Sequence, residues 1–178
     1  MSKELTESDL KELSEKVRAV SDRIQILEVR LLECRSEQKH SNNELPRRIT
    51  TNIDVDTHFD ASSLRLSVYP RFLLLVKEQN TAPEDFFIRI EARFVVSYAV
   101  RSEEGLTQDN FDAFGERNGI YNVWPYWREF VQSTTARMGL PPLTLPVFRV
   151  GTAKLKQEAS LPQPKAVKQI AAAPSSEE

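Results

Sequence analysis

The chain begins with a helical pattern of apolar residues. Its apolar positions recur at spacings of three and four, which places them on one helix face over residues 6–21: Leu10, Leu13, Val17 and Val20. Thr6, followed three residues later by Asp9, has the spacing of a capping box at the helix start. The other helix positions are polar or charged, so we expect this narrow stripe to pack on a sheet or on another subunit.

Four stretches of alternating or β-branched apolar residues follow, and each predicts a strand. They cover residues 24–34, 49–59, 64–77 and 86–100. The first loses its alternation near Leu31 and Leu32, which indicates a β-bulge, and Pro70 in the third indicates an edge position or a bulge. Because the strands follow one another with short connections, we expect an antiparallel sheet.

From residue 108 the pattern returns to helical spacing. We expect a short helix over residues 108–114 and a main helix over residues 119–138, ending at Gly139. The main helix carries one apolar stripe: Ile120, Trp124, Trp127, Val131, Thr134 and Met138. Proline is tolerated only in the first turn of a helix or at a kink, so Pro125 places the start of the regular helix, or a kink, near Trp124.

These elements predict an α+β protein with a four-stranded antiparallel sheet, a long C-terminal helix packed on it and an N-terminal helix. We expect residues 1–23 to form the N-terminal amphipathic helix, residues 24–150 the folded domain and residues 151–178 a mostly disordered tail. One helix on one sheet leaves apolar surface uncovered, so we expect the protomer to form oligomers.

The composition contains few of the groups that catalysis needs. The 178 residues carry a formal net charge of -2, without the basic excess of nucleic-acid-binding proteins, and include 2 histidines and 5 glycines. No apolar run reaches the roughly 18 to 20 residues that span a membrane. We find no zinc spacing and no phosphate-binding glycine loop, so we expect no enzyme, no cofactor and no metal. The lone Cys34 is expected to be buried and inert, in a cytoplasmic protein without disulfides.

The main predicted helix carries more aromatic residues than one sheet can cover. Trp124 and Trp127 lie on its apolar stripe, and further aromatic side chains lie toward the flanks: Tyr121, Tyr126 and Phe130. This surplus indicates a subunit interface, a binding groove, or both.

The segment 140–148 is apolar although it contains three prolines. Loops are normally polar because they are exposed. This segment therefore either caps the end of the core or forms one wall of a hydrophobic groove that accepts an extended peptide. In the second case its contact residues would be Leu143, Leu145 and Phe148, together with Tyr121, Tyr126 and Phe130.

Residues 124–146 resemble the SecB family of export chaperones. In that family the long helix begins with an aromatic residue followed by Pro-Tyr-x-Arg-Glu, and a Pro-x-Leu-x-Leu loop follows the helix. The matching positions are Trp124, Pro125, Tyr126, Arg128, Glu129, Ser133, Arg137, Gly139, Pro141, Leu143 and Leu145. The preceding strands agree in order and length, so the resemblance extends over residues 24–148, within the predicted domain.

The resemblance implies an ATP-independent chaperone that binds unfolded or aggregation-prone polypeptides and assembles as a homotetramer. It places the loop 140–148 in the client groove. In the family, acidic residues on the sheet contact the export motor SecA; Glu33 and Glu37 match two of them, whereas Arg89 stands close to where another acid is expected.

Two other features look more like the SecB-like chaperones of toxin–antitoxin systems, which protect an aggregation-prone antitoxin: the N-terminal helix and the Leu-Pro-Pro-Leu-Thr-Leu loop. The partner is therefore an unfolded export client or an antitoxin. A structural or adaptor subunit, which oligomerises without general client binding, is the alternative.

Overall fold

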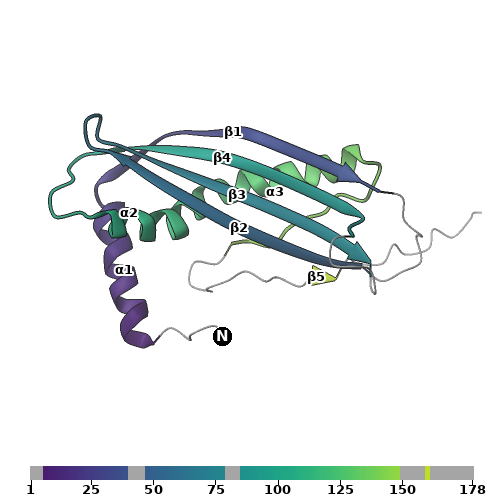
Figure 1. The fold of residues 1–178 in the computed structure, drawn as a ribbon, viewed down its shortest axis with the longest axis horizontal. Helices are drawn as coiled ribbons and strands as arrows, with labels where there is room; N and C mark the ends of the chain where they lie inside the picture. Colours follow the sequence, from purple (N-terminus) through teal and green to yellow (C-terminus); the bar gives the residue numbers. More distant parts are fainter. Residues whose placement is uncertain (1–5, 40–46, 79–84, 149–158, 161–178) are drawn as a thin grey trace, which may run out of the picture.

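In the computed structural model, one antiparallel sheet carries a long helix across one face, and two further helices lie at one end of the strands (Figure 1). The structure describes residues 6–39, 47–78, 85–148 and 159–160. The strands are β1 (Ile24–Gln38), β2 (Arg47–Asp60), β3 (Arg65–Glu78), β4 (Ile88–Val100) and β5 (Ala159–Ser160). The helices are α1 (Glu7–Ser21), α2 (Gln108–Phe114), the π-helical η1 (Gly115–Gly119) and α3 (Ile120–Arg137). The predicted α+β class is confirmed.

The strands lie in the order β1-β4-β3-β2-β5, so β1 forms one edge of the sheet. Its register with β4 shifts between Ile26 and Glu28 and again between Leu31 and Glu33. The bulge predicted near Leu31 is therefore present, and a second one lies at Leu27. Both add a residue to β1, and bulges of this kind are common at sheet edges.

Pro70 lies in a central strand, which corrects the predicted edge position or bulge. On the β4 side, pairing is interrupted between Val68 and Arg71, and the register is the same before and after the gap. On the β2 side, Pro70 stays paired with Val55. Proline lacks the N–H that the ladder uses, so the sheet loses pairing locally without shifting.

The core lies between α3 and the sheet face that carries the even-numbered residues of β4, as the alternation predicts. Phe72 of β3 is its centre. The Phe72 ring stacks on Trp127 at 5.1 Å and meets Phe94 and Trp124 edge-on, each at 6.0 Å between ring centroids. Offset-stacked and edge-to-face arrangements of this kind are the favourable ones for aromatic pairs.

The main helix predicted over residues 119–138 is present, and the regular start near Trp124, one of the two alternatives drawn from Pro125, is wrong. Regular α-helix starts at Ile120, directly after η1, and Pro125 lies inside it. In η1 the backbone passes close to the sheet: a Cβ at Gly115 would collide with Thr57 Oγ1, and one at Gly119 would lie 2.7 Å from Val68 Cγ1. Glycine permits this approach. The predicted stop at Gly139 is confirmed, with a φ of +74°.

Helix α1 is joined to the domain through its C-terminal turn. The predicted capping box is present, because the Thr6 side chain accepts from the Asp9 amide and Asp9 accepts from the Thr6 amide. Val20 is fully buried, and Ser21 Oγ accepts from Asn118 Nδ2 at 3.0 Å. At the other end Leu10 is exposed, so only part of the predicted stripe packs on the domain.

Of the predicted C-terminal tail, the structure describes two residues. Ala159 and Ser160 form β5 and pair with Ile49 and Arg48 of β2, and the rest of residues 151–178 lies outside the described part of the chain. Among the helices that the structure describes, none is long and apolar enough to cross a membrane.

Candidate functional site

The loop 140–148 runs back along one flank of α3, antiparallel to the helix. Three hydrogen bonds attach its backbone to helix side chains: Leu143 N to Thr135 Oγ1 (2.9 Å), Arg128 Nε to the Leu145 carbonyl (2.8 Å) and Trp124 Nε1 to the Pro146 carbonyl (2.9 Å). At the end of the loop the Phe148 ring lies 5.4 Å from the Trp124 ring. The loop is therefore a fixed part of the surface, in a conformation that its prolines favour.

The loop buries one of its apolar side chains and exposes another. Leu145 is 5% exposed and belongs to the core, so at this residue the loop caps the core. Leu143 and Phe148 are half-buried, and Val147 is 59% exposed. Val147 is missing from the predicted contacts because the motif contains no signal for which way each loop side chain points.

The two exposed tyrosines of α3 lie on different flanks. Tyr121 and Tyr126 are 54% and 52% exposed. Five residues correspond to about 140° around a helix axis, so the two rings point in different directions. Tyr121 lies one turn before Trp124, on the flank that carries the loop. We call Tyr121, Leu143, Val147 and Phe148 the loop flank.

The other flank of α3 points toward β4. Asn122, one turn before Tyr126, donates a hydrogen bond of 2.9 Å to Tyr98 Oη of β4. Burial raises the pKa of Tyr98 to about 12, so this phenol stays protonated at neutral pH. Phe130, one turn after Tyr126, is half-buried and stacks on Trp127.

Beyond β4 on this side lies the edge strand β1, which exposes large apolar side chains. Four are 40% to 52% exposed: Ile26, Leu27, Leu31 and Leu32. Together with Tyr126 and Phe130 we call them the β1 flank. These four residues are not among the predicted contact residues, because the sequence pattern does not show that β1 is an edge strand.

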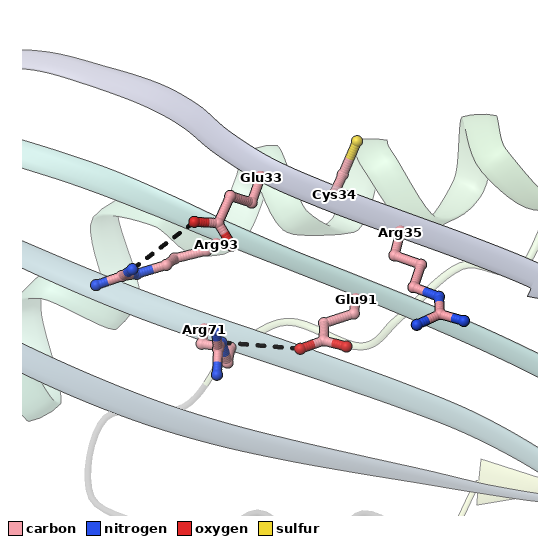
Figure 2. A pocket seen from close by; sticks show the side chains of 6 residues that line it. All are labelled: Glu33, Cys34, Arg35, Arg71, Glu91 and Arg93. Carbon is pink, nitrogen blue, oxygen red and sulfur yellow. Dashed lines mark ion pairs between the residues drawn. The ribbon is translucent and has the colours of Figure 1, made fainter.

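The predicted SecA contacts lie on the outer face of the sheet, away from α3. Glu33 Oε1 lies 3.9 Å from Arg93 Nη1, and Glu37 Oε2 lies 3.2 Å from Arg35 Nη2 (Figure 2 draws the first pair). Each acid thus has an arginine beside it, which weakens the negative potential of this face. Their role in binding SecA stays a prediction.

Cys34 is exposed, which corrects the expectation of a buried thiol. Its neighbour across the strand is Ala92 of β4, and within the described residues no strand lies on its other side, because β1 is at the edge of the sheet. In Figure 2 the Cys34 sulfur points away from the other five side chains.

Comparisons with known proteins show that the chain is similar in sequence to SecB-like chaperones. The chain is 24% identical over 159 residues, which is 80% of this chain and 87% of the relative, to the SecB-like chaperone Rv1957 of Mycobacterium tuberculosis H37Rv. It is 32% identical over 71 residues, 39% of this chain and 37% of the relative, to the SecB-like chaperone MT2006 of M. tuberculosis CDC 1551. No family model matches the chain.

The fold agrees with these relatives. The solved structure of M. tuberculosis Rv1957 in complex with a ChAD peptide from the Rv1956 HigA1 antitoxin superposes with a TM-score of 0.63 at 22% identity, covering 78% of this chain and 99% of that one. The fold of this chain is therefore SecB-like. The resemblance predicted from residues 124–146 is confirmed. Both sequence relatives are named chaperones, not enzymes.

Proposed function

We propose that this chain is an ATP-independent chaperone that holds an aggregation-prone polypeptide, with an antitoxin as its main client. The observation that carries the proposal is the loop flank, where Tyr121 and Val147 are exposed beside a hydrogen-bonded apolar loop. Similarity to a SecB-like chaperone whose solved structure contains an antitoxin peptide supports the same function. We place the protein in the cytoplasm and propose no cofactor.

Client binding would rest on burial of apolar surface. An extended polypeptide lying along the loop flank covers Tyr121 and Val147 together with the exposed parts of Leu143 and Phe148. Each Å² of apolar surface removed from water contributes roughly 25 cal/mol, without requiring a particular client sequence. Leu145 supports this surface from below, since it is already in the core.

The β1 flank is our candidate for assembly. Strand β1 has 15 residues and exposes leucines. An edge strand of this kind has unpaired backbone N–H and C=O groups, so it can pair with a strand of another chain. We propose that a second copy covers it, as a step toward the homotetramer that the SecB resemblance implies. Tyr126 and Phe130, predicted as client contacts, then belong to the subunit interface.

The export role has weaker support than the antitoxin role. Arginine side chains accompany Glu33 and Glu37, and Arg89 is hydrogen-bonded to Glu91 at 2.8 Å. An acidic docking face for SecA would therefore be largely neutralised here.

The proposed holding activity is tested by light scattering. A chemically unfolded test protein is diluted into buffer without ATP, alone or with this chain. We expect suppression of aggregation at a near-stoichiometric ratio. The double variant Tyr121→Ser, Val147→Ser should need several-fold more protein for the same effect, because it removes the two most exposed apolar side chains of the loop flank.

The control replaces Glu129 by Ser, an exposed residue of α3 that belongs to neither flank, and should hold the test protein as the native chain does. An oligomeric native chain without any suppression would refute the holding function and favour the alternative adaptor subunit. Equal activity of the native chain and the double variant would remove the loop flank from the site.

A further inference from the structure

The N-terminal half of α1 projects away from the rest of the domain (Figure 1). The helix is attached to the domain at its other end, where Val20 is fully buried and the Arg101 amide donates to the Arg23 carbonyl at 2.8 Å. Earlier on the same apolar stripe, Leu10 is 39% exposed and Leu13 is half-buried. One end of the stripe therefore packs on the domain, and the other end presents two leucines to the solvent.

Local interactions alone give this half of α1 little stability. The capping box of Thr6 and Asp9 and the ion pair between Lys16 and Glu12 (2.9 Å) support the helix from within, but such surface interactions are weak. A helix of 15 residues is marginal in water, and in proteins its stability comes mainly from packing of its apolar face. We therefore expect a second surface to cover the exposed leucines.

The stripe has the spacing of a coiled-coil seam, with apolar residues separated alternately by three and four positions. Val17 and Val20 already contact the core, so a second helix has room only at Leu10 and Leu13. In an antiparallel pair of two α1 helices, with the two-fold axis between residues 11 and 12, each Leu10 lies level with the partner's Leu13. The two domains then lie at opposite ends of the helix pair.

The charged residues beside the stripe match this antiparallel arrangement. Asp9 and Lys16 lie on one side of the stripe, seven residues or about two turns apart. In the antiparallel pair each Asp9 faces the partner's Lys16, and on the other side of the stripe Glu7 faces the partner's Ser14. A parallel pair would set Asp9 against Ser14 and Lys16 against Ser21, without an ion pair. An unfolded client has no fixed charges to meet this pattern, so a second copy is the better occupant.

We propose that α1 pairs with α1 of a second copy as an antiparallel helix pair, which rests on the oligomer proposed above and supplies its second interface. A closed tetramer built from two-fold dimers needs two different interfaces, and the β1 flank supplies only one. Two leucines from each helix bury far less than the roughly 800 Å² per partner of a stable interface. The helices therefore join copies that the β1 flank has already paired, because two helix pairs then form between the same two dimers.

Sedimentation velocity of the double variant Leu10→Gln, Leu13→Gln tests the helix pair. The native chain should sediment as four protomers and the variant as two, because glutamine keeps the helix propensity of leucine but removes the apolar surface. The control, Ser8→Gln with Glu15→Gln, changes two exposed residues on the opposite face of α1 and should keep the native mass. Suppression of aggregation per protomer should be equal in all three proteins, because the loop flank is unchanged.

Four results would overturn the helix pair: a native chain that sediments as a monomer, an unchanged mass in the Leu10→Gln, Leu13→Gln variant, an equal loss of mass in the control, or a loss of client holding at unchanged mass. The first result would refute the proposed oligomer as well. If the α1 variant changes the mass but lysines on the β1 flank do not, the β1 flank alone is refuted.

Disulfide formation tests the antiparallel direction and keeps both leucines, so it also decides if the glutamine variant loses its helix. In a Cys34→Ser background, which removes the exposed native thiol, one protein carries Glu7→Cys and another carries Ser14→Cys. Oxidation of the mixture should link the two proteins. Either protein alone should give several-fold less, because its equivalent positions lie about 10 Å apart along the helix pair. Equal linking in the single proteins would refute the antiparallel pair.

Discussion

Replacement of Trp127 by Ala should lower the free energy of unfolding by about 3–5 kcal/mol, the usual cost of removing a large aromatic side chain from a core. Trp127 is fully buried and stacks on Phe72 and Phe130 at 5.1 and 6.1 Å. Its removal would separate α3 from the centre of the sheet. For a chain of this size the melting temperature should fall by on the order of 10 °C.

Trp127→Phe is the matched control. The indole Nε1 is buried and has no acceptor within the described residues, so phenylalanine keeps most of the packing and removes an unpaired donor. Calorimetry at equal protomer concentration should therefore give a much smaller loss for Trp127→Phe than for Trp127→Ala. Equal losses would mean that packing at this position does not hold α3 on the sheet.

The double variant Ile26→Lys, Leu31→Lys should convert the proposed oligomer into single chains. Both residues lie on the α3 side of β1, opposite Tyr98 and Phe94, and are 46% and 40% exposed. A lysine at either position would have to lose its hydration if a second copy covered this flank. Sedimentation velocity should give a larger mass for the native chain and the mass of one protomer for the variant.

Gln25→Lys is the control for this experiment, since Gln25 is exposed on the same strand and pairs with Ala99, on the outer face. It should leave the oligomer intact. A native chain that sediments as a monomer, or an oligomer that survives both lysines, would show that the β1 flank is not the assembly surface.

Local patterns predicted the elements well. Alternation in β2 and β4 and the apolar stripe of α3 report which face is buried. The stripe residues from Ile120 to Thr134 are buried as predicted, and Val123 and Thr135 beside them are buried as well. The capping box at Thr6 and the stop at Gly139 are set by neighbouring residues alone. Such features need no knowledge of distant contacts.

Features that depend on sheet order were not predictable in this way. The position of β1 beside β4 explains why Cys34 is exposed, and a central position for β3 explains why Pro70 interrupts pairing without a bulge. The same limit applies to η1, whose two glycines are required by contacts with Thr57 and Val68 of the sheet.

For the candidate site, the motif located the helix and the loop but not the direction of each side chain. It grouped Tyr121 with Tyr126, which lie about 140° apart around the helix. It also counted Leu145 among surface residues, whereas Leu145 lies in the core. A change of Leu145 to Ser would therefore report on stability, and exposed residues are the better probes of binding.

Photocrosslinking is the most direct measurement of where clients bind. Benzoylphenylalanine is placed at position 121 in one protein and at position 126 in another, and each is irradiated with a labelled unfolded polypeptide. We expect a client adduct from position 121, and from position 126 an adduct with a second copy of the chain. Client adducts from position 126 and none from position 121 would contradict this expectation.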